Sequence, residues 1–382
     1  MELIAEPQAL ASQAGTGSVV FYRCNPDASM AEHDLSTKAA VAQSISRLLG
    51  LDYAGPFDPG KVLPGPLYVV PSHTMTDAAL VQRLGIRGVS DFFGGVVPYP
   101  FVGTKAITHP LIHAEAAAPG GWVFAHAASL GDMVLPGFTA FSLADAQEAG
   151  NRLLARGAVR IKQPGGVGGA GQFVAEDRAA LRAHLASVDE ATLQREGLVL
   201  EANLSEVQTL SIGRVQVGEW IASYFGTQHQ IPNNRGDEVY GGSNLTVVRG
   251  GFEELLALDL EPPVRTAAEQ SIRYHDAAFA HYPGMFASRS NYDVAQGTDG
   301  QGRWRSGVLE QSWRIGGASG AEIAALHAFD ADPSLHVVHA STRELYGEGH
   351  TIPQGAWVHY DGVDHHGQKL VKYVEVRRHG YV

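Results

Sequence analysis

The sequence predicts a parallel α/β domain at the N-terminus, followed by a larger two-lobed domain of the α+β class with antiparallel sheets. Three observations support this fold class. Strand and helix patterns alternate up to about residue 115. A helix pattern then leads into an apolar strand and a glycine-rich loop at residues 159–171. Short extended segments separated by turns make up most of the chain after residue 196.

Two strand-helix units define the N-terminal domain, which we place at residues 1–115. The apolar run 19–22 predicts a buried strand, and the helix that follows ends at Gly50, where a left-handed glycine is favoured. Residues 67–70 and 78–84 repeat the pattern of strand and helix. Strands that alternate with helices in this way favour a parallel sheet.

The remaining chain is predicted to form one two-lobed domain and a terminal hairpin. The weak periodicity around Pro119-Gly-Gly121 places the domain boundary there. The domain covers residues 116–345, with lobes at about 116–195 and 196–345, and a β-hairpin is expected at 346–382. The strands expected in the second lobe are residues 197–201, 210–217, 220–225, 244–249, 291–294 and 308–314, with a helix at 265–279.

The first lobe contains the glycine loop. Ser142 and Asp145 form a capping box that begins a helix, and residues 159–162 form the strand after it. Residues 172–175 are again extended, so the loop is predicted to connect two strands. Gly166 to Gly171 also matches the dinucleotide fingerprint G-x-G-x-x-G, but that fingerprint requires a helix that starts within the motif. The following strand favours a phosphate-covering flap instead.

The composition limits the classes of partner. The formal charge of −12 and the absence of a basic run argue against nucleic-acid binding. No apolar run reaches the roughly 20 residues that span a bilayer. Cys24 is the single cysteine, and the first residues lack the pattern of a signal peptide, so a cytoplasmic protein is expected. A homodimer is a reasonable expectation, because most soluble oligomers are symmetric dimers.

Lys162 is the first candidate for chemistry. A lysine at the end of an apolar strand, directly before a glycine loop, can point at phosphate oxygens that the loop amides also cover. The alternative is a solvated lysine below an ordinary loop. Arg249 offers a second cation that could reach a phosphate from a facing strand, or it could be a charge on an edge strand.

A second group of candidates lies near residue 310. Side chains alternate along a strand, so Glu310, Ser312 and Arg314 are expected on one face, and Asp293 is expected to end the preceding strand of a hairpin. Two carboxylates with a small oxygen ligand suit Mg²⁺, which takes its other ligands from phosphate and water. Arg314 could then neutralise a transferred phosphoryl group or a substrate carboxylate. The alternative is a surface ion pair between Glu310 and Arg314.

The order of these motifs resembles the ATP-grasp superfamily over about residues 100–325. The resemblance implies ATP and Mg²⁺ as cofactors, and catalytic roles for Lys162 and Arg314. It assigns to ATP the residues Lys105, Lys162, Gly165, Gly166, Gly168, Gly169, Gly171, Glu201, Ala202, Leu204 and Gln208. It assigns the metal to Asp293, Glu310 and Ser312. The N-terminal unit resembles the domain that usually precedes the grasp.

Three of these assignments have alternatives or depart from the usual pattern. Lys105 stands roughly where the first nucleotide lysine is expected, with His109 or His126 as alternatives. Glu206 is an alternative to Gln208 at the ribose. Ser312 replaces the usual metal-binding asparagine, which weakens one metal position.

The resemblance implies an ATP- and Mg²⁺-dependent ligase. Such an enzyme activates a carboxylate as an acyl phosphate, which an amine or similar nucleophile then attacks, so the partners would be a small carboxylate and a small amine. A narrower resemblance is to an uncharacterised bacterial family that is biotin-carboxylase-like, carried by segments such as Asn291 to Val294 and Leu309 to Ser319. The alternatives are therefore bicarbonate activation of the biotin-carboxylase type and an ATP-binding regulatory protein without turnover.

Overall fold

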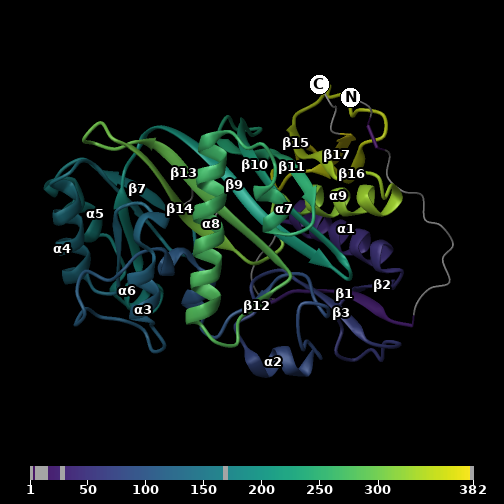
Figure 1. Ribbon diagram of the computed structural model, residues 1–382, viewed down its shortest axis with the longest axis horizontal. Helices are drawn as coiled ribbons and strands as arrows, with labels where there is room; N and C mark the ends of the chain where they lie inside the picture. Colours follow the sequence, from purple (N-terminus) through teal and green to yellow (C-terminus); the bar gives the residue numbers. More distant parts are fainter. Residues whose placement is uncertain (1–2, 5–15, 26–30, 167–170, 379–382) are drawn as a thin grey trace.

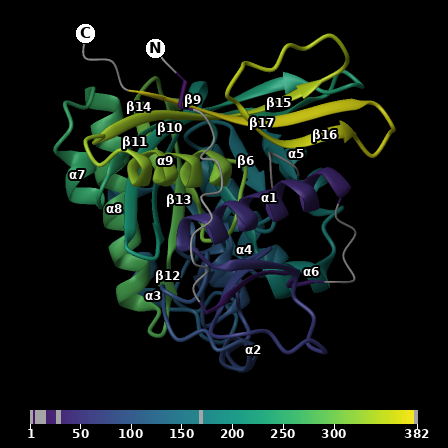
Figure 2. The same ribbon diagram turned by 90° about the vertical axis from the view of Figure 1, so that its right-hand side faces the viewer.

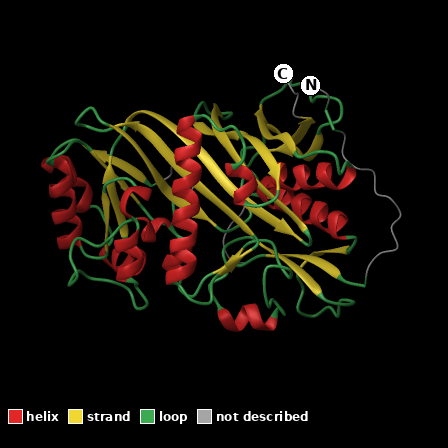
Figure 3. Cartoon of the chain, viewed as in Figure 1, coloured by secondary structure: helices red, strands yellow, loops and turns green. Residues whose placement is uncertain are grey.

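The computed structural model describes residues 3–4, 16–25, 31–166 and 171–378. Within them the strands form three larger sheets and one short pair (Figure 1). A small parallel sheet belongs to the N-terminal region, a four-stranded sheet carries the glycine loop, and an eight-stranded sheet runs through the middle of the molecule (Figure 3). The predicted combination of a parallel N-terminal sheet with antiparallel sheets is confirmed.

The N-terminal sheet has the strand order β2-β1-β3, and all of its pairs are parallel. Its strands are β1 (Ser18–Tyr22), β2 (Asp52–Pro56) and β3 (Leu67–Pro71), and its helices are α1 (Glu32–Leu49) and α2 (Ala78–Arg83). As expected, α1 ends at Gly50 with a left-handed backbone, φ 65°. The sequence did not predict β2, because its residues Asp-Tyr-Ala-Gly-Pro include three that are depleted in strands.

The segment between the N-terminal sheet and the first lobe is made of short elements. These are β4 (Gly95–Val96), η1 (Pro100–Gly103), η2 (Lys105–Thr108), α3 (Phe124–Ser129) and η3 (Gly131–Met133). The β4 strand pairs with β12 (Phe286–Ala287), far away in the sequence. The η2 turn contacts β14 and the four-stranded sheet, so it brings Lys105 between the two larger sheets.

The four-stranded sheet has the order β5-β8-β6-β7, with antiparallel pairs throughout. Its strands are β5 (Gly137–Ala140), β6 (Val159–Lys162), β7 (Gln172–Ala175) and β8 (Leu198–Ala202), and its helices are α4 (Leu143–Leu154), α5 (Arg178–Leu185) and α6 (Glu190–Glu196). Ser142 caps α4 by accepting the amide of Asp145, at 3.1 Å. The β6 and β7 strands pair directly, which confirms that the glycine loop connects two strands.

The eight-stranded sheet has the order β14-β13-β9-β10-β11-β15-β17-β16. Its strands are β9 (Ser205–Val217), β10 (Trp220–Pro232), β11 (Glu238–Arg249), β13 (Arg289–Thr298), β14 (Trp304–Ser312), β15 (Val337–Tyr346), β16 (Trp357–Val363) and β17 (Lys369–Arg378). The other helices are α7 (Phe252–Leu256), α8 (Pro262–His281) and α9 (Ser319–Ala331). The α8 helix lies across β9, β13 and β14 (Figure 1).

The N-terminal domain packs onto this sheet through α9. The α1 and α9 helices lie side by side beneath β15, β16 and β17 (Figure 2). One hydrophobic core joins them, with Val41 and Ile45 from α1 and Ile323 and Phe329 from α9 all buried. Burial of these apolar side chains holds the N-terminal sheet and α1 against the eight-stranded sheet. Among the described residues, no helix is long and apolar enough to cross a membrane.

Two local expectations were wrong. Asp293 lies inside β13, opposite Glu310, and does not end the strand. The β14 strand ends at Ser312, so Arg314 follows the strand and does not continue its face. The hairpin is thus shifted relative to the apolar runs from which the strands were inferred: β13 continues to Thr298, whereas β14 stops at Ser312.

Candidate nucleotide and metal site

The end of β6 places a buried lysine against a buried glutamate. Lys162 lies on β6 and Glu201 on the neighbouring β8, and the distance from Lys162 Nζ to Glu201 Oε1 is 2.5 Å. His109 approaches the other carboxylate oxygen, with Nε2 at 3.1 Å from Oε2. All three side chains are almost fully buried. Burial alone would raise the pKa of Glu201, but Lys162 and His109 hold that pKa at about 2. The carboxylate therefore remains charged.

Lys105 connects the glycine loop with the predicted metal residues. Its Nζ donates to the carbonyl oxygen of Gly166 at 2.6 Å and lies 2.6 Å from Glu310 Oε2. The side chain is 6% exposed, so the ammonium depends on these two partners. The structure thus places Lys105, the predicted first nucleotide lysine, against both the glycine loop and β14, the strand that carries Glu310. His126, the other alternative, instead approaches the carbonyl of Ile107 with its Nε2, at 3.2 Å.

The glycine loop is described on both of its sides. Gln163 donates its amide to the carbonyl of Gly171 at 3.1 Å, and Gly166 donates to the carbonyl of Gln163 at 3.0 Å. Gly171 has a φ of 71°, a conformation that favours glycine. Gly168 and Gly169, which we also assigned to ATP, lie outside the described residues.

Asp293 and Glu310 face each other across the β13–β14 ladder. Three side chains donate to the same oxygen of Asp293, Oδ1: Ser211 at 2.8 Å, Asn291 at 3.0 Å and Gln228 at 3.1 Å. No described residue donates to Oδ2. Burial and the neighbouring charge of Glu310 raise the pKa of Asp293. Two carboxylates placed together in this way favour a bound cation.

The donor set suits magnesium better than a metal that needs a complete protein cage. The described residues contain no group of three or more His, Cys, Asp or Glu side chains able to hold a metal ion. Each of the two carboxylates, however, keeps one oxygen without a hydrogen bond or ion pair to a described residue. Mg²⁺ is typically bound by one or two carboxylates, with phosphate and water completing the octahedron.

Ser312 lies beside a guanidinium. Arg289 Nη1 donates to Ser312 Oγ at 3.2 Å and to the carbonyl oxygen of Arg314 at 2.7 Å. Arg289 is itself fixed by Glu322, with Nη2 at 2.7 Å from Oε1, and Tyr224 donates to the same carboxylate oxygen at 2.6 Å. A positive charge therefore already lies at the third predicted metal residue.

Arg314 belongs to a positively charged group that the two domains build together. Its pKa is lowered by burial and by the nearby Arg289, while Glu310 and Asp293 act in the opposite direction. From the N-terminal domain, Lys38 on α1 has its pKa lowered by burial and by Arg314. Burial, Lys38 and Arg314 lower the pKa of His73 to about 4. Sequence reasoning missed Lys38 and His73, because no motif links either of them to the grasp.

The predicted adenine and ribose residues lie between the end of β8 and the start of β9. The Ala202 amide donates to the carbonyl of Pro136 at 2.8 Å. Leu204 is buried in a small core with Leu135 and Ala295. Gln208 is exposed on β9, and the alternative Glu206 has a positive φ of 50°.

Arg249 is placed with a different part of the molecule. Its guanidinium donates to the carbonyl oxygen of Phe329, in the last turn of α9, at 2.6 Å and to that of Leu335, after the helix, at 3.1 Å. It also lies over the rings of Trp220 and Phe329. These contacts anchor the end of β11 to α9, and none of them is shared with Lys162 or Asp293.

Comparison with known proteins places the chain in a family. The family described as "Protein of unknown function (DUF3182)" matches residues 21–374, which is most of the sequence. The chain belongs to this family. A comparison with curated proteins gives no match.

Solved structures show which fold this family member has. The chain is similar to N5-carboxyaminoimidazole synthetase from Staphylococcus aureus complexed with ADP: 11% identity, TM-score 0.51, covering 94% of this chain and 92% of that one. The chain is also similar to phosphoribosylamine–glycine ligase from Thermotoga maritima, with 12% identity and a TM-score of 0.51, covering 95% of this chain and 92% of that one. For biotin carboxylase from Campylobacter jejuni the identity is 10% and the TM-score 0.50, covering 96% of this chain and 88% of that one. The DUF3182 chain has the ATP-grasp fold, as its motifs indicated.

Proposed function

We propose that this protein is an ATP- and Mg²⁺-dependent ligase that activates a carboxylate as an acyl phosphate for attack by an amine or similar nucleophile. The observation that carries the proposal is the meeting of Lys105 with both the glycine loop and Glu310. Segments about 60 and 200 residues apart thereby join phosphate-binding and metal-binding groups at one place. Two of the similar structures bear the names of a synthetase and a ligase, and one of these contains ADP.

The phosphates of ATP would lie between the glycine loop and the two lysines. Lys162 and Lys105 supply fixed positive charge, and each is held by a carboxylate, Glu201 or Glu310. Amides of the loop add neutral donors to the same oxygens. Charge that is already in place before the ligand arrives costs no reorganisation when negative charge shifts during phosphoryl transfer.

Asp293 and Glu310 would hold magnesium. When bound, the ion neutralises charge that develops on the transferred phosphoryl group. The three donors on Asp293 Oδ1 fix that carboxylate, so Oδ2 is left for the metal. Ser312, already contacted by Arg289, would add at most a weak ligand.

The acid to be activated would lie toward the N-terminal domain. Arg314 and Lys38 place positive charge there, and a carboxylate or acyl phosphate is the group that such charge stabilises. His73 has its pKa lowered to about 4, so it is neutral near pH 7 and can act there as a hydrogen-bonding group without adding charge. The positive charges of Arg314 and Lys38 favour an anionic substrate group, and they do not select the rest of the acid.

A second candidate function is an ATP-binding regulatory protein without turnover. The observation that favours it is the guanidinium of Arg289 beside Ser312, where the third metal ligand is otherwise expected. Bicarbonate activation of the biotin-carboxylase type is a third possibility, and it is tested by including bicarbonate with free biotin among the substrates.

An ADP-release screen over carboxylates and amines, with the product identified by mass spectrometry, separates these functions. The ligase is expected to release ADP only when both an acid and a nucleophile are present. Lys162→Ala and Glu310→Gln should abolish release, while Arg178→Gln, an exposed change on α5, should retain it. ATP binding in calorimetry without ADP formation across the panel would favour the regulatory protein. Unchanged turnover in both site variants would refute the assignment.

A further inference from the structure

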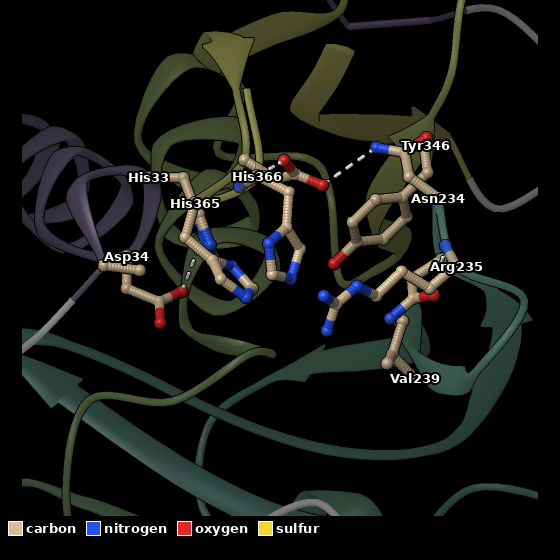
Figure 4. A pocket seen from close by; sticks show the side chains of 11 residues that line it. His33, Asp34, Asn234, Arg235, Val239, Tyr346, His365 and His366 are labelled. Atoms are coloured by element: carbon tan, nitrogen blue, oxygen red, sulfur yellow. Dashed lines mark hydrogen bonds and ion pairs between the residues drawn. The ribbon is translucent and has the colours of Figure 1, made fainter. Parts of the chain in front are cut away.

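A separate hollow lies where four segments meet that are far apart in the sequence. Its volume is about 240 Å³. It is bounded by the start of α1, the tip of the β10–β11 hairpin, the end of β15 and the turn between β16 and β17 (Figure 4). None of the residues assigned to ATP or to the metal lines it.

Basic and hydrogen-bonding side chains point into this hollow. Figure 4 shows the guanidinium of Arg235, the phenol of Tyr346 and the rings of His365 and His366 directed toward a common space. The Arg235 guanidinium forms no ion pair with a described residue. The rings of His365 and His366 contact each other, with centroids 3.8 Å apart. The hollow therefore presents several donors from different directions, the arrangement that binds an oxyanion.

The two carboxylates of the hollow are already engaged. Asp364 accepts the amides of His366 at 2.8 Å and Gln368 at 3.0 Å, as well as the Asn234 side chain at 2.9 Å. Asp34 pairs with His33 and with Lys372, both at 3.2 Å. The Asn234 contact fixes the β10–β11 tip to the β16–β17 turn, so Arg235 and His366 are held on opposite sides of the same space.

We infer that this hollow binds a phosphate group, either free or as part of a small phosphomonoester. A guanidinium can bind two oxygens of a phosphate, and the phenol and imidazole donors can reach the others. The volume exceeds that of one phosphate and leaves room for a short organic tail. The site is distinct from the ATP site and does not depend on the proposed ligase activity.

The charged and polar groups around the hollow determine how strongly it attracts an anion. His33, His365 and His366 all face the space. The other charged groups around it are Arg235, Lys372, Asp34, Asp364 and Glu344, together with the phenols of Tyr346 and Tyr360. Asp34 and Asp364 are already engaged by protein donors, so the Arg235 guanidinium is left to attract an anion.

Calorimetric titration of the full chain with sulfate tests the site, because sulfate is a tetrahedral dianion like phosphate. Arg235→Gln should weaken sulfate binding at pH 6 at least about tenfold, and His366→Gln should weaken it less. Arg178→Gln removes an exposed arginine on α5 and should leave binding unchanged. ATP affinity should be the same in all three variants, because none of them touches the Lys162 site.

Inorganic phosphate and glycerol phosphate identify the source of the bound group. Tighter binding of glycerol phosphate assigns the hollow to a phosphomonoester, and equal or tighter binding of inorganic phosphate assigns it to the free ion. The inference is overturned if Arg235→Gln binds sulfate as tightly as the unmodified chain, or if sulfate does not bind at pH 6.

Discussion

The candidate site has two halves, one around Lys162 and one around Glu310, and they differ in how their buried charges are paired. Around Lys162 every charged group faces an opposite one, because Glu201 is shared between Lys162 and His109. Around Glu310 like charges are also neighbours: Asp293 lies opposite Glu310 and Arg314 lies near Arg289, although Lys105 pairs with Glu310 and Glu322 pairs with Arg289. The first half is thus complete without a ligand. The second is strained by its own charges, and a cation with an anionic substrate would relieve that strain.

This difference separates stability from function within one site. A buried pair resists unfolding as long as both partners are present, so its residues should matter most to the fold. Carboxylates that repel each other lower stability and persist where a ligand uses them. Mutations in the two halves should therefore have opposite effects on stability.

The largest expected effect is at Glu201. Glu201→Ala leaves the Lys162 ammonium buried without its carboxylate, which should lower the free energy of unfolding by about 3–5 kcal/mol. Chemical denaturation measures the loss. The matched control is Glu148→Ala, which breaks the exposed Glu148–Arg152 pair and should cost less than about 0.5 kcal/mol.

A charge-balanced double variant sharpens this comparison. Lys162→Met combined with Glu201→Gln removes both buried charges, and it should recover most of the stability lost in Glu201→Ala. A double variant no more stable than the single one would show that the pair itself is not the source of the loss.

The next largest effect is expected at Asp293, where substitution should not lower the free energy of unfolding, in contrast to Glu201→Ala. Asp293→Asn keeps the oxygen that accepts from Ser211, Asn291 and Gln228 but removes the charge that faces Glu310. Without magnesium the variant should be at least as stable as the unmodified chain. Magnesium should raise the melting temperature of the unmodified chain in the presence of ATP and should not raise that of the variant. ADP release should fall at least about a hundredfold, as for loss of a group that acts in the transition state.

The pH dependence of stability gives an independent measure of the same repulsion. Burial and Glu310 raise the pKa of Asp293 above that of an unfolded aspartate, about 3.9. The native state then holds a proton that the unfolded state releases, so stability falls as the pH rises from about 3.9 through the native pKa. Asp293→Asn removes this loss of stability with rising pH. Unfolding curves at pH 4 and pH 7 should therefore diverge between the two chains, with the variant favoured at pH 7.

Sequence reasoning reached one half of this site more fully than the other. Lys162 and its loop were found because a lysine strand, a glycine run and a second strand are adjacent in the sequence, and local order predicts their pairing. The long hairpin was placed less well, because Asp293 and Glu310 are aligned by a ladder whose register includes a bulge. A bulge leaves no periodic signal in the sequence.

Contacts between distant segments were the part that the sequence could not show. Lys38, His73 and Arg289 reach the site only because α1 and α9 pack together and β13 crosses the sheet. A lysine on an amphipathic helix and a histidine in a loop carry no local mark of such a role. The partner of Ser312 was hidden for the same reason, although the serine itself was recognised as a departure.

The smallest effect is expected at Ser312, where the comparison is most easily broken. Ser312→Ala removes one acceptor of Arg289, which keeps the carbonyl of Arg314 and the carboxylate of Glu322, so stability should fall by less than about 1 kcal/mol. If magnesium is held by Asp293 and Glu310 alone, its affinity in the presence of ATP should change less than about twofold, because no ligand has been lost. A tenfold or larger loss of magnesium affinity would instead make the serine a metal ligand. Arg289 would then have to leave the Ser312 hydroxyl when the metal binds, and the like-charged half of the site would prove to be a rearranging one.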